Sequence, residues 1–136
     1  MKILVIDGQG GKMGKAIVEQ LVKAGYKDDV IAVGTNAVAT AAMIKAGVAG
    51  ATGENPVKVN AAKADYIIGP MGIIAANSLL GEITPAMALA VSESNARKLL
   101  IPVSKCNIQV MGTVDKPMND YIMEICEYLD EEEYTC

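Results

Sequence analysis

Two short stretches of the chain hold groups that could carry chemistry. Residues 7–14, DGQGGKMG, place four glycines behind an aspartate, and residues 104–107, SKCN, place a thiol beside an amine. Glycines let a backbone approach a phosphate closely, and the free N–H groups at a helix start attract the anion. The first stretch therefore predicts nucleotide or phosphate binding, and the second predicts thiol chemistry.

The spacing of the glycines restricts the kind of nucleotide site. The dinucleotide fingerprint G-x-G-x-x-G would need glycine in place of Met13, whereas the chain reads G-x-G-G-x-x-G. A P-loop is excluded, because Gly8 lies one residue too far from Gly14 and Ala16 replaces the Ser or Thr that binds Mg²⁺. A glycine turn that only packs a strand on a helix is the alternative to ligand binding.

The residues after the second predicted strand favour a phosphorylated dinucleotide. The acidic residue that would hold a ribose 2′-hydroxyl is missing there, and Thr35 and Asn36 stand in its place. These two residues and Lys12 are candidates to receive the 2′-phosphate of NADP, so NADP(H) is the first expected ligand and another nucleotide the next. The predicted cofactor-binding residues are Gly8, Gln9, Gly10, Gly11, Lys12, Met13, Gly14, Thr35, Asn36, Gly69 and Gly72.

Three carboxylates near these loops have more than one interpretation. Asp7 could orient a ligand hydroxyl or a metal-bound water, or it could cap the N–H groups of its own loop. Glu54 and Glu82 could act as general acid–base groups if desolvated, or they could be ordinary helix-start carboxylates favoured by the helix dipole. A zinc site is not expected, because the chain has no histidine and its three cysteines are widely spaced.

Cys106 is the predicted nucleophile, with Lys105 assisting it and Asp7 as the third catalytic candidate. A thiol just past a strand and beside a lysine can have a lowered pKa. The lack of histidine excludes a papain-like dyad, and a partly buried inert thiol is the alternative. Cys126 is expected in the core, on the inner side of the last helix.

The elements that would position these residues alternate along the chain. Short apolar runs predict strands, and apolar residues at helical spacing predict helices. Strands are predicted at residues 3–6, 28–34, 48–52, 64–69, 98–103 and 108–112, and helices at 13–24, 37–44, 56–63, 85–95 and from 117 onward. Residues 70–81 are predicted to form a loop with a short buried helix. Predicted helix caps are Thr35 or Asn36, then Asn55, then Thr84.

This alternation predicts an α/β fold. Strand–helix–strand units give a parallel sheet with right-handed crossovers. We expect residues 1–136 to form a single three-layer Rossmann-like nucleotide-binding domain, with a mostly parallel sheet of five or six strands. Hydrophobic residues make up 51% of the chain, and Phe and Trp are absent, which suits a sheet covered by closely packed helices on both faces.

Charge and hydropathy exclude some classes of binding partner. The basic residues form no cluster for nucleic acid, and the uncharged run at residues 66–81 is too short and too broken for a membrane span. No signal peptide is visible, so a cytoplasmic location is expected. Residues 115–136 hold 8 of the 16 acidic residues. This tail is interpreted as a solvated helix face, with a docking tail as the alternative.

Two resemblances add to this interpretation. The glycine loop resembles that of dihydrodipicolinate reductases, roughly G-x-x-G-R/K-M-G, which implies NAD(P)H binding but no reaction. Five further stretches, spread over nearly the whole chain, are IDGQGG, GTNAVATAAMIKAG, GATGEN, IGPMGIIAANSLLGEITPAMA and LIPVSKCN. Together they resemble a family of small bacterial proteins, a domain of unknown function common in anaerobic Gram-positive bacteria. This resemblance supports the fold and implies no activity.

Three functions follow as hypotheses. The first is a small protein that binds a nucleotide or dinucleotide above the glycine loop, as a homodimer formed through residues 70–81 or the last helix. Because a dehydrogenase usually adds a substrate domain, either a second subunit completes the site or the protein senses its ligand without catalysis. The second is an enzyme that uses Cys106 on a small phosphorylated or carboxylated substrate. The third is a non-catalytic interaction module that uses the acidic tail.

Overall fold

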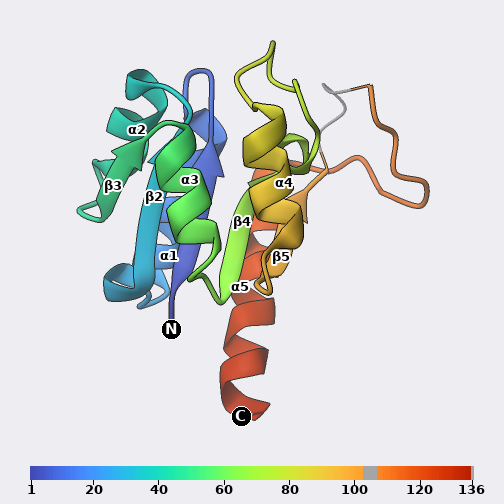
Figure 1. Cartoon of the computed structure of the whole chain (residues 1–136). Helices are drawn as coiled ribbons and strands as arrows, with labels where there is room; N and C mark the ends of the chain where they lie inside the picture. The colour runs from blue at the N-terminus through green and yellow to red at the C-terminus, as the bar shows by residue number, and fades with distance from the viewer. Residues whose placement is uncertain (103–106, 136) are drawn as a thin grey trace.

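A computed structural model of the chain describes residues 1–102 and 107–135, with side chains described as far as residue 133. Within these residues, five strands form one all-parallel sheet in the order β3-β2-β1-β4-β5 (Figure 1). The strands are β1 (Ile3–Asp7), β2 (Val30–Gly34), β3 (Ala49–Thr52), β4 (Tyr66–Pro70) and β5 (Arg97–Ile101). The helices are α1 (Lys12–Lys23), α2 (Ala37–Ile44), α3 (Glu54–Ala61), α4 (Pro85–Glu93) and α5 (Met118–Thr135), with short 3₁₀ turns η1 (Lys27–Asp29) and η2 (Met71–Ile74).

The central strand β1 shows why these residues form a sheet with two covered faces. Successive side chains of a strand point to opposite faces. Ile3 and Val5 belong to one apolar cluster, whereas Leu4 and Ile6 belong to the other, and all four are at most 2% exposed. A continuous apolar run is therefore needed in β1, because neither face meets water.

Helices supply the two outer layers, which confirms the predicted α/β fold. On one face α1, α2 and α5 pack against the strands, for example through Ile17 and Ile122. On the other face α3 and α4 do so, for example through Val57 and Val91, and Figure 1 shows these two helices in front of the sheet. Helices on both faces leave the two ends of the strands as the places where loops gather.

Five predicted strands and the predicted helices are present, with many of their ends shifted by one or two residues, but the predicted sixth strand is wrong. Residues 108–112 form no strand, and their apolar side chains Ile108, Val110 and Met111 are 39%, 41% and 84% exposed. Alternating apolar residues indicate a strand only when a neighbouring strand can pair with them. In the described part of the chain β5 is the last strand of the sheet, and this segment follows it as an extended arm.

The predicted helix caps are correct at two places and wrong at one. Asn36 caps α2 by accepting a hydrogen bond from the N–H of Ala39, and Thr84 caps α4 by accepting one from the N–H of Met87. Asn55 does not cap α3; Gly53 does, because the helix begins one residue before Asn55. The predicted buried helix within residues 70–81 is η2, a single 3₁₀ turn followed by a loop.

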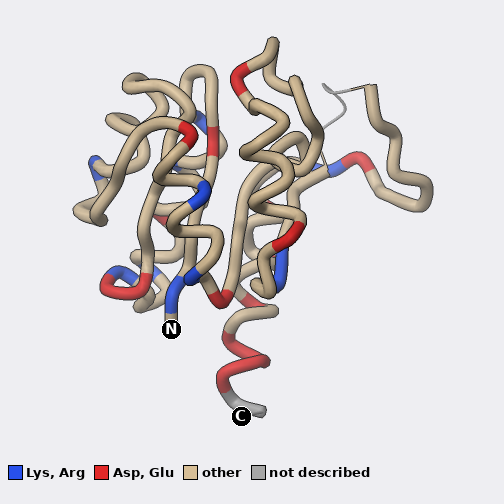
Figure 2. Tube along the Cα trace, viewed as in Figure 1, with Lys and Arg blue, Asp and Glu red and all other residues tan. Residues whose placement is uncertain are grey.

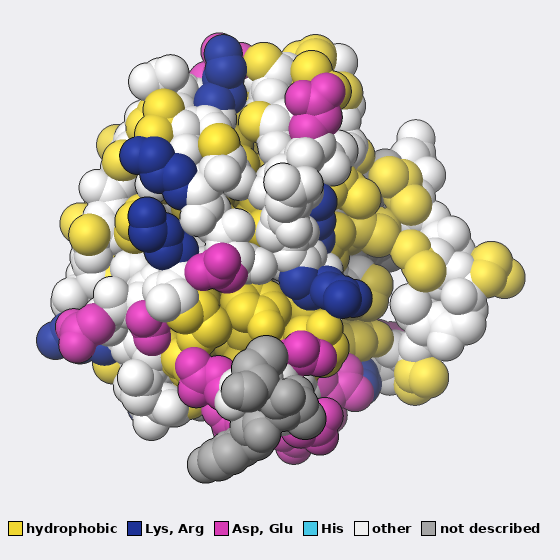
Figure 3. All heavy atoms as spheres, turned by 60° about the horizontal axis from the view of Figure 1, so that its bottom comes forward, with side chains coloured by type: hydrophobic (Ala, Val, Ile, Leu, Met, Phe, Trp, Pro, Cys, Tyr) yellow, Lys and Arg dark blue, Asp and Glu magenta, His cyan; other side chains and the backbone are white. Residues whose placement is uncertain are grey.

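Helix α5 confirms that Cys126 lies on the inner side of the last helix, and it carries the acidic tail past the sheet. Ile122 and Leu129 are buried, and so is Cys126, whose pKa burial raises. The hydroxyl of Tyr26 donates to Asp130 Oδ1 at 2.6 Å. The final turns project past the sheet near the N-terminus (Figures 1 and 2), and Figure 3 shows their acidic side chains beside an apolar area. None of the described helices has the length and apolarity to cross a membrane.

Candidate functional site

The predicted loops meet at one edge of the sheet. The chain leaves β1 towards β2 on one side, and β4 pairs with β1 on the other side, so the topology reverses between β1 and β4. In open parallel sheets ligands bind outside the carboxyl ends of the strands at this reversal. The glycine loop, residues 8–14, follows β1 there, and Thr35 and Asn36 follow β2. The structure thus brings most of the predicted cofactor-binding residues together.

Asp7 serves the glycine loop itself. Its carboxylate is 6% exposed and accepts the N–H of Gly8 at 2.8 Å and the N–H of Gly14 at 2.7 Å. Burial raises the pKa of Asp7, these two hydrogen bonds lower it, and the charge of Glu82 raises it, so that the pKa lies above its ordinary value. Of the two interpretations of Asp7, the geometry matches the cap on its own loop, with both oxygens occupied.

Two glycines of the loop are explained by helix packing. A Cβ on Gly11 would lie 2.7 Å from Ala39 Cα, and the φ angle of Gly11 is +73°. A Cβ on Gly14 would lie 2.5 Å from Met43 Sδ and 2.7 Å from Asp7 Cβ. Both positions need glycine because α1 must approach α2 and β1 closely. This is the packing alternative to phosphate binding, and it accounts for half of the glycines in the loop.

The Cβ positions of the other two glycines meet no helix. A Cβ on Gly8 would lie 2.6 Å from Thr35 Oγ1 and 3.1 Å from Glu82 Oε1, so Gly8 leaves room for polar groups that converge above it. A Cβ on Gly10 would meet no described atom within 4 Å. Gly8 is buried beneath these groups and Gly10 is exposed, so Gly10 is the position where glycine leaves the backbone accessible.

Glu82 is the residue on which the site converges. One oxygen, Oε1, accepts the N–H of Gln9 at 2.9 Å, the hydroxyl of Thr35 at 2.6 Å and the amide of Asn36 at 2.6 Å. The donors follow β1 and β2, whereas Glu82 comes from the connection between β4 and α4. The second amide hydrogen bond of Asn36, to the carbonyl of Gln9 at 3.0 Å, fixes the same arrangement. We call Gln9 N–H, Thr35 Oγ1 and Asn36 Nδ2 the oxyanion cradle.

The cradle favours a negative charge. Desolvation raises the pKa of Glu82, but the hydrogen bonds from Thr35, Gln9 and Asn36 outweigh it and hold the pKa below its ordinary value. Glu82 was expected to be either a general acid–base group or a helix-start carboxylate. Its carboxylate instead lies against the glycine loop. Glu54 is in the first turn of α3, as expected, and accepts the hydroxyl of Thr84 at 2.6 Å.

The segment that carries Glu82, residues 75–83, is named here the β4–α4 loop. Leu79 of this loop lies over the reversal point, because its methyl carbons are 3.0 Å from the Cβ position of Gly8 and 3.9 Å from that of Gly72. Figure 1 shows the β4–α4 loop and the glycine loop standing at the same end of the sheet. Leu79 and Glu82 together cover the point where the topology reverses.

Gly69 and Gly72, the predicted cofactor-binding residues after β4, have different surroundings. A Cβ on Gly69 would lie 2.4 Å from the carbonyl oxygen of Ile6, so strand pairing explains that glycine. Gly72 lies in η2, where its carbonyl accepts the hydroxyl of Ser78. Lys12 and Met13 begin α1 at the end that faces the cradle. Among the described residues, no group of three or more His, Cys, Asp or Glu gathers as a metal site.

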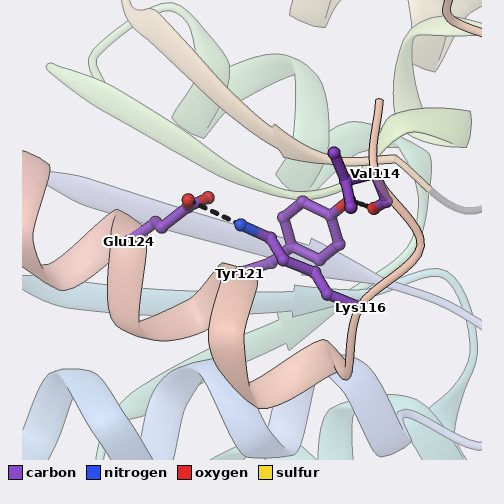
Figure 4. A network of polar contacts seen from close by, with 4 residues as sticks. All are labelled: Val114, Lys116, Tyr121 and Glu124. Carbon is purple, nitrogen blue, oxygen red and sulfur yellow. Dashed lines mark hydrogen bonds and ion pairs between the residues drawn. The ribbon is translucent and has the colours of Figure 1, made fainter. Parts of the chain in front are cut away.

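The predicted thiol site lies outside the described residues, since these leave out Ser104, Lys105 and Cys106. Described residues on both sides of this gap in the sequence line an open pocket of about 450 Å³, separate from the oxyanion cradle, between Ile101, Val110 and α5. Figure 4 shows part of its wall: Lys116 Nζ lies 2.6 Å from Glu124 Oε1 and 4.5 Å from the centroid of the Tyr121 ring, and the Tyr121 hydroxyl donates to the Val114 carbonyl.

Comparisons with known proteins place the chain in a family. A family model described as a domain of unknown function, DUF3842, matches residues 2–133. No curated protein and no solved structure matches the chain. The family match covers all five described strands and all but the end of α5, in agreement with the whole-chain resemblance of the sequence. The chain belongs to the DUF3842 family, a domain of unknown function.

Proposed function

We propose that the protein binds a nucleotide that carries a phosphate group, at the sheet edge above the glycine loop, with NADP(H) as the first ligand to test. The observation that carries the proposal is the oxyanion cradle. Donors from two separate connections converge on a single anionic oxygen of Glu82. Phosphate oxygens accept the same kind of hydrogen bond from N–H and O–H donors.

The position of the cradle favours the 2′-phosphate of NADP over the pyrophosphate. Thr35 and Asn36 directly follow β2, where a dinucleotide fold holds the adenosine ribose. The start of α1, where the pyrophosphate would lie, has one N–H engaged by Asp7. Gly10, with no described atom near its Cβ position, leaves the backbone open beside the cradle. In this protein a carboxylate occupies donors that in a dinucleotide fold would bind a ribose or its phosphate. This supports a ligand that carries an anionic group at this point.

A titration with one matched pair of variants tests the proposal. NADPH, NADH and ATP are added to the wild type, to Lys12→Gln and to Lys23→Gln, which lie at opposite ends of α1. Lys12 is an exposed residue of the glycine loop. We expect NADPH to bind more tightly than NADH, and Lys12→Gln to weaken NADPH binding about tenfold while Lys23→Gln leaves it unchanged.

Native mass spectrometry of freshly purified protein is the complementary measurement. A bound nucleotide released on denaturation supports the proposal, and the same spectrum reports whether the chain forms the predicted homodimer. The proposal is wrong if millimolar NADPH, NADH and ATP all fail to bind, since the glycine loop would then serve packing alone. Thiol chemistry at Cys106 stays a separate prediction, tested by whether iodoacetamide labels Cys106 faster than Cys136 at neutral pH.

A further inference from the structure

The β4–α4 loop is built as one unit with its own internal hydrogen bonds. The N–H of Asn77 donates to the carbonyl of Ile83 at 2.7 Å, and the N–H of Ile83 returns to the carbonyl of Ser78 at 3.2 Å. The N–H of Gly81 donates to the carbonyls of Asn77 and Ser78, both at 3.2 Å. These bonds connect residues of the loop to one another, and the loop is anchored in the core at its end by Ile83, which is 0% exposed.

The attachment of this loop to the glycine loop is narrow. Of the hydrogen bonds found among the described residues, those that join residues 75–83 to the segments after β1 and β2 all end on Glu82 Oε1. Beside them, Leu79 makes an apolar contact at Gly8. The other oxygen of Glu82 accepts no hydrogen bond from a described residue. One atom therefore carries the polar contacts between the two loops.

The backbone of the loop is strained in its present position. Asn77, Leu79 and Leu80 have φ angles of +66°, +54° and +55°. Asparagine tolerates this left-handed region, whereas leucine adopts it at a cost in conformational energy. Leu80 gains no burial in return, since it is 96% exposed. Such outliers persist only where surrounding contacts hold them, and here the contacts are the hydrogen bonds within the loop together with the three hydrogen bonds to Glu82.

We propose that Glu82 is an internal competitor for the ligand phosphate, so that the β4–α4 loop closes the site by filling the oxyanion cradle and opens when a phosphate displaces the Glu82 carboxylate. This inference rests on the proposed function and adds that the β4–α4 loop is a gate, which makes the site selective. A neutral ribose hydroxyl displaces a charged carboxylate poorly from donors that favour a negative charge. A dianionic phosphate, with more charge and more acceptor oxygens, does so better. The gate therefore selects a phosphorylated ligand over its unphosphorylated analogue.

The first test measures the gate without any ligand. Backbone hydrogen exchange of residues 77–83 is compared in the wild type, Glu82→Ala and the control Glu93→Ala, which removes an exposed carboxylate from the far end of α4. We expect exchange in this loop at least tenfold faster in Glu82→Ala, with β1 and α1 unchanged and Glu93→Ala like the wild type. Unchanged exchange in Glu82→Ala overturns the inference.

The second test titrates NADPH into the same proteins and into Glu82→Gln, which keeps the acceptor oxygen but removes the charge. When a binding-competent state is only partly populated, the apparent affinity falls by that fraction. Removing the competitor is therefore expected to tighten NADPH binding at least tenfold in Glu82→Ala, with Glu82→Gln between it and the wild type.

The outcomes separate the inference from the proposed function. If wild type and Glu82→Ala bind NADPH equally, or if Glu82→Ala binds more weakly, the competitor role is wrong while nucleotide binding stands. If the wild type binds NADPH and Glu82→Ala binds it at least tenfold more tightly, both stand. If no protein binds NADPH, NADH or ATP, the proposed function is wrong and so is the competitor role. The exchange data then decide only whether Glu82 holds the loop closed.

Discussion

The glycine loop and the β4–α4 loop face each other across the same sheet edge, and a carboxylate holds each of them in a different way. Asp7 lies at the end of its own strand, is buried, and uses both oxygens on N–H groups of the loop that follows it. Glu82 is partly exposed and uses one oxygen on groups from two other connections. Asp7 holds a short-range turn together, whereas Glu82 closes a long-range contact.

This difference separates architecture from function at the site. Contacts made by Asp7, Gly11 and Gly14 are needed for α1 to pack on β1 and α2, whether or not a ligand binds. The contacts made by Glu82 join two loops that would otherwise touch mainly through Leu79. Loss of the contacts made by Asp7, Gly11 and Gly14 should lower the free energy of unfolding of the whole domain. Loss of the contacts made by Glu82 should change how readily the β4–α4 loop opens. The following predictions test that division.

The largest effect is expected at Gly11. Gly11→Ala places a Cβ on the backbone of Ala39 at a positive φ angle, and we expect it to lower the free energy of unfolding by about 3 kcal/mol. Gly10→Ala, next in the chain and with open space at its Cβ position, should change it by less than about 0.5 kcal/mol. Urea denaturation measures both. Equal values for the two variants would show that α1 does not need this close approach to α2.

An intermediate effect is expected at Asp7. Asp7→Ala leaves the buried N–H groups of Gly8 and Gly14 without their acceptor, so the free energy of unfolding should fall by about 2 kcal/mol. The control is Asp65→Ala, which removes an exposed carboxylate that accepts the N–H of Lys2 at 2.8 Å, and should cost well under about 1 kcal/mol. A cost for Asp7→Ala no larger than that of the control would contradict the architectural role of Asp7.

The smallest effect is expected in the pH dependence of the free energy of unfolding, where Glu82 and Asp7 should contribute with opposite signs. The lowered pKa of Glu82 means that its ionised form stabilises the fold above its unfolded pKa, and that this contribution is lost as the pH falls through the folded pKa. The raised pKa of Asp7 works the other way, so its contribution is complete below its unfolded pKa and declines as the pH rises through the folded pKa.

The decrease in the free energy of unfolding caused by Glu82→Gln should therefore become smaller as the pH falls from neutral to about pH 3. The decrease caused by Asp7→Asn should become larger over the same range. Urea unfolding of the two variants and the wild type at several pH values measures both trends. Trends of the same sign would remove the distinction between the two carboxylates.

The sheet was predictable because its signal is local. The run Ile3–Ile6 is apolar at every position, and each residue is buried on one face or the other. The residues at the carboxyl ends of β1 and β2 were predictable for the same reason, since they follow strands directly. Residues 108–112 carry a similar apolar pattern without forming a strand, because pairing depends on a neighbour that the pattern does not contain.

The role of Glu82 was not predictable from its surroundings in the sequence. It is separated by 73 residues from Gln9 and by 46 from Asn36, and its position depends on left-handed leucines that intrinsic preferences disfavour. The packing roles of Gly11 and Gly14 were hidden in the same way, because they depend on the approach of α2. A weak signal existed in Thr35 and Asn36, two hydrogen-bond donors at a position where dinucleotide folds place an acid.

The place of β1 in the sheet also has a consequence for how the chain acquires its structure during synthesis. Leu4 pairs with Ile31 on one side and with Ile67 on the other. A nascent chain that ends at α3 has made β1, β2 and β3 but not β4, so the strand that ends at the glycine loop is an unpaired edge. A strand that is buried at all five positions in the finished fold then has one edge open to other chains until residues 66–70 have left the ribosome, and chaperones can protect it during this interval.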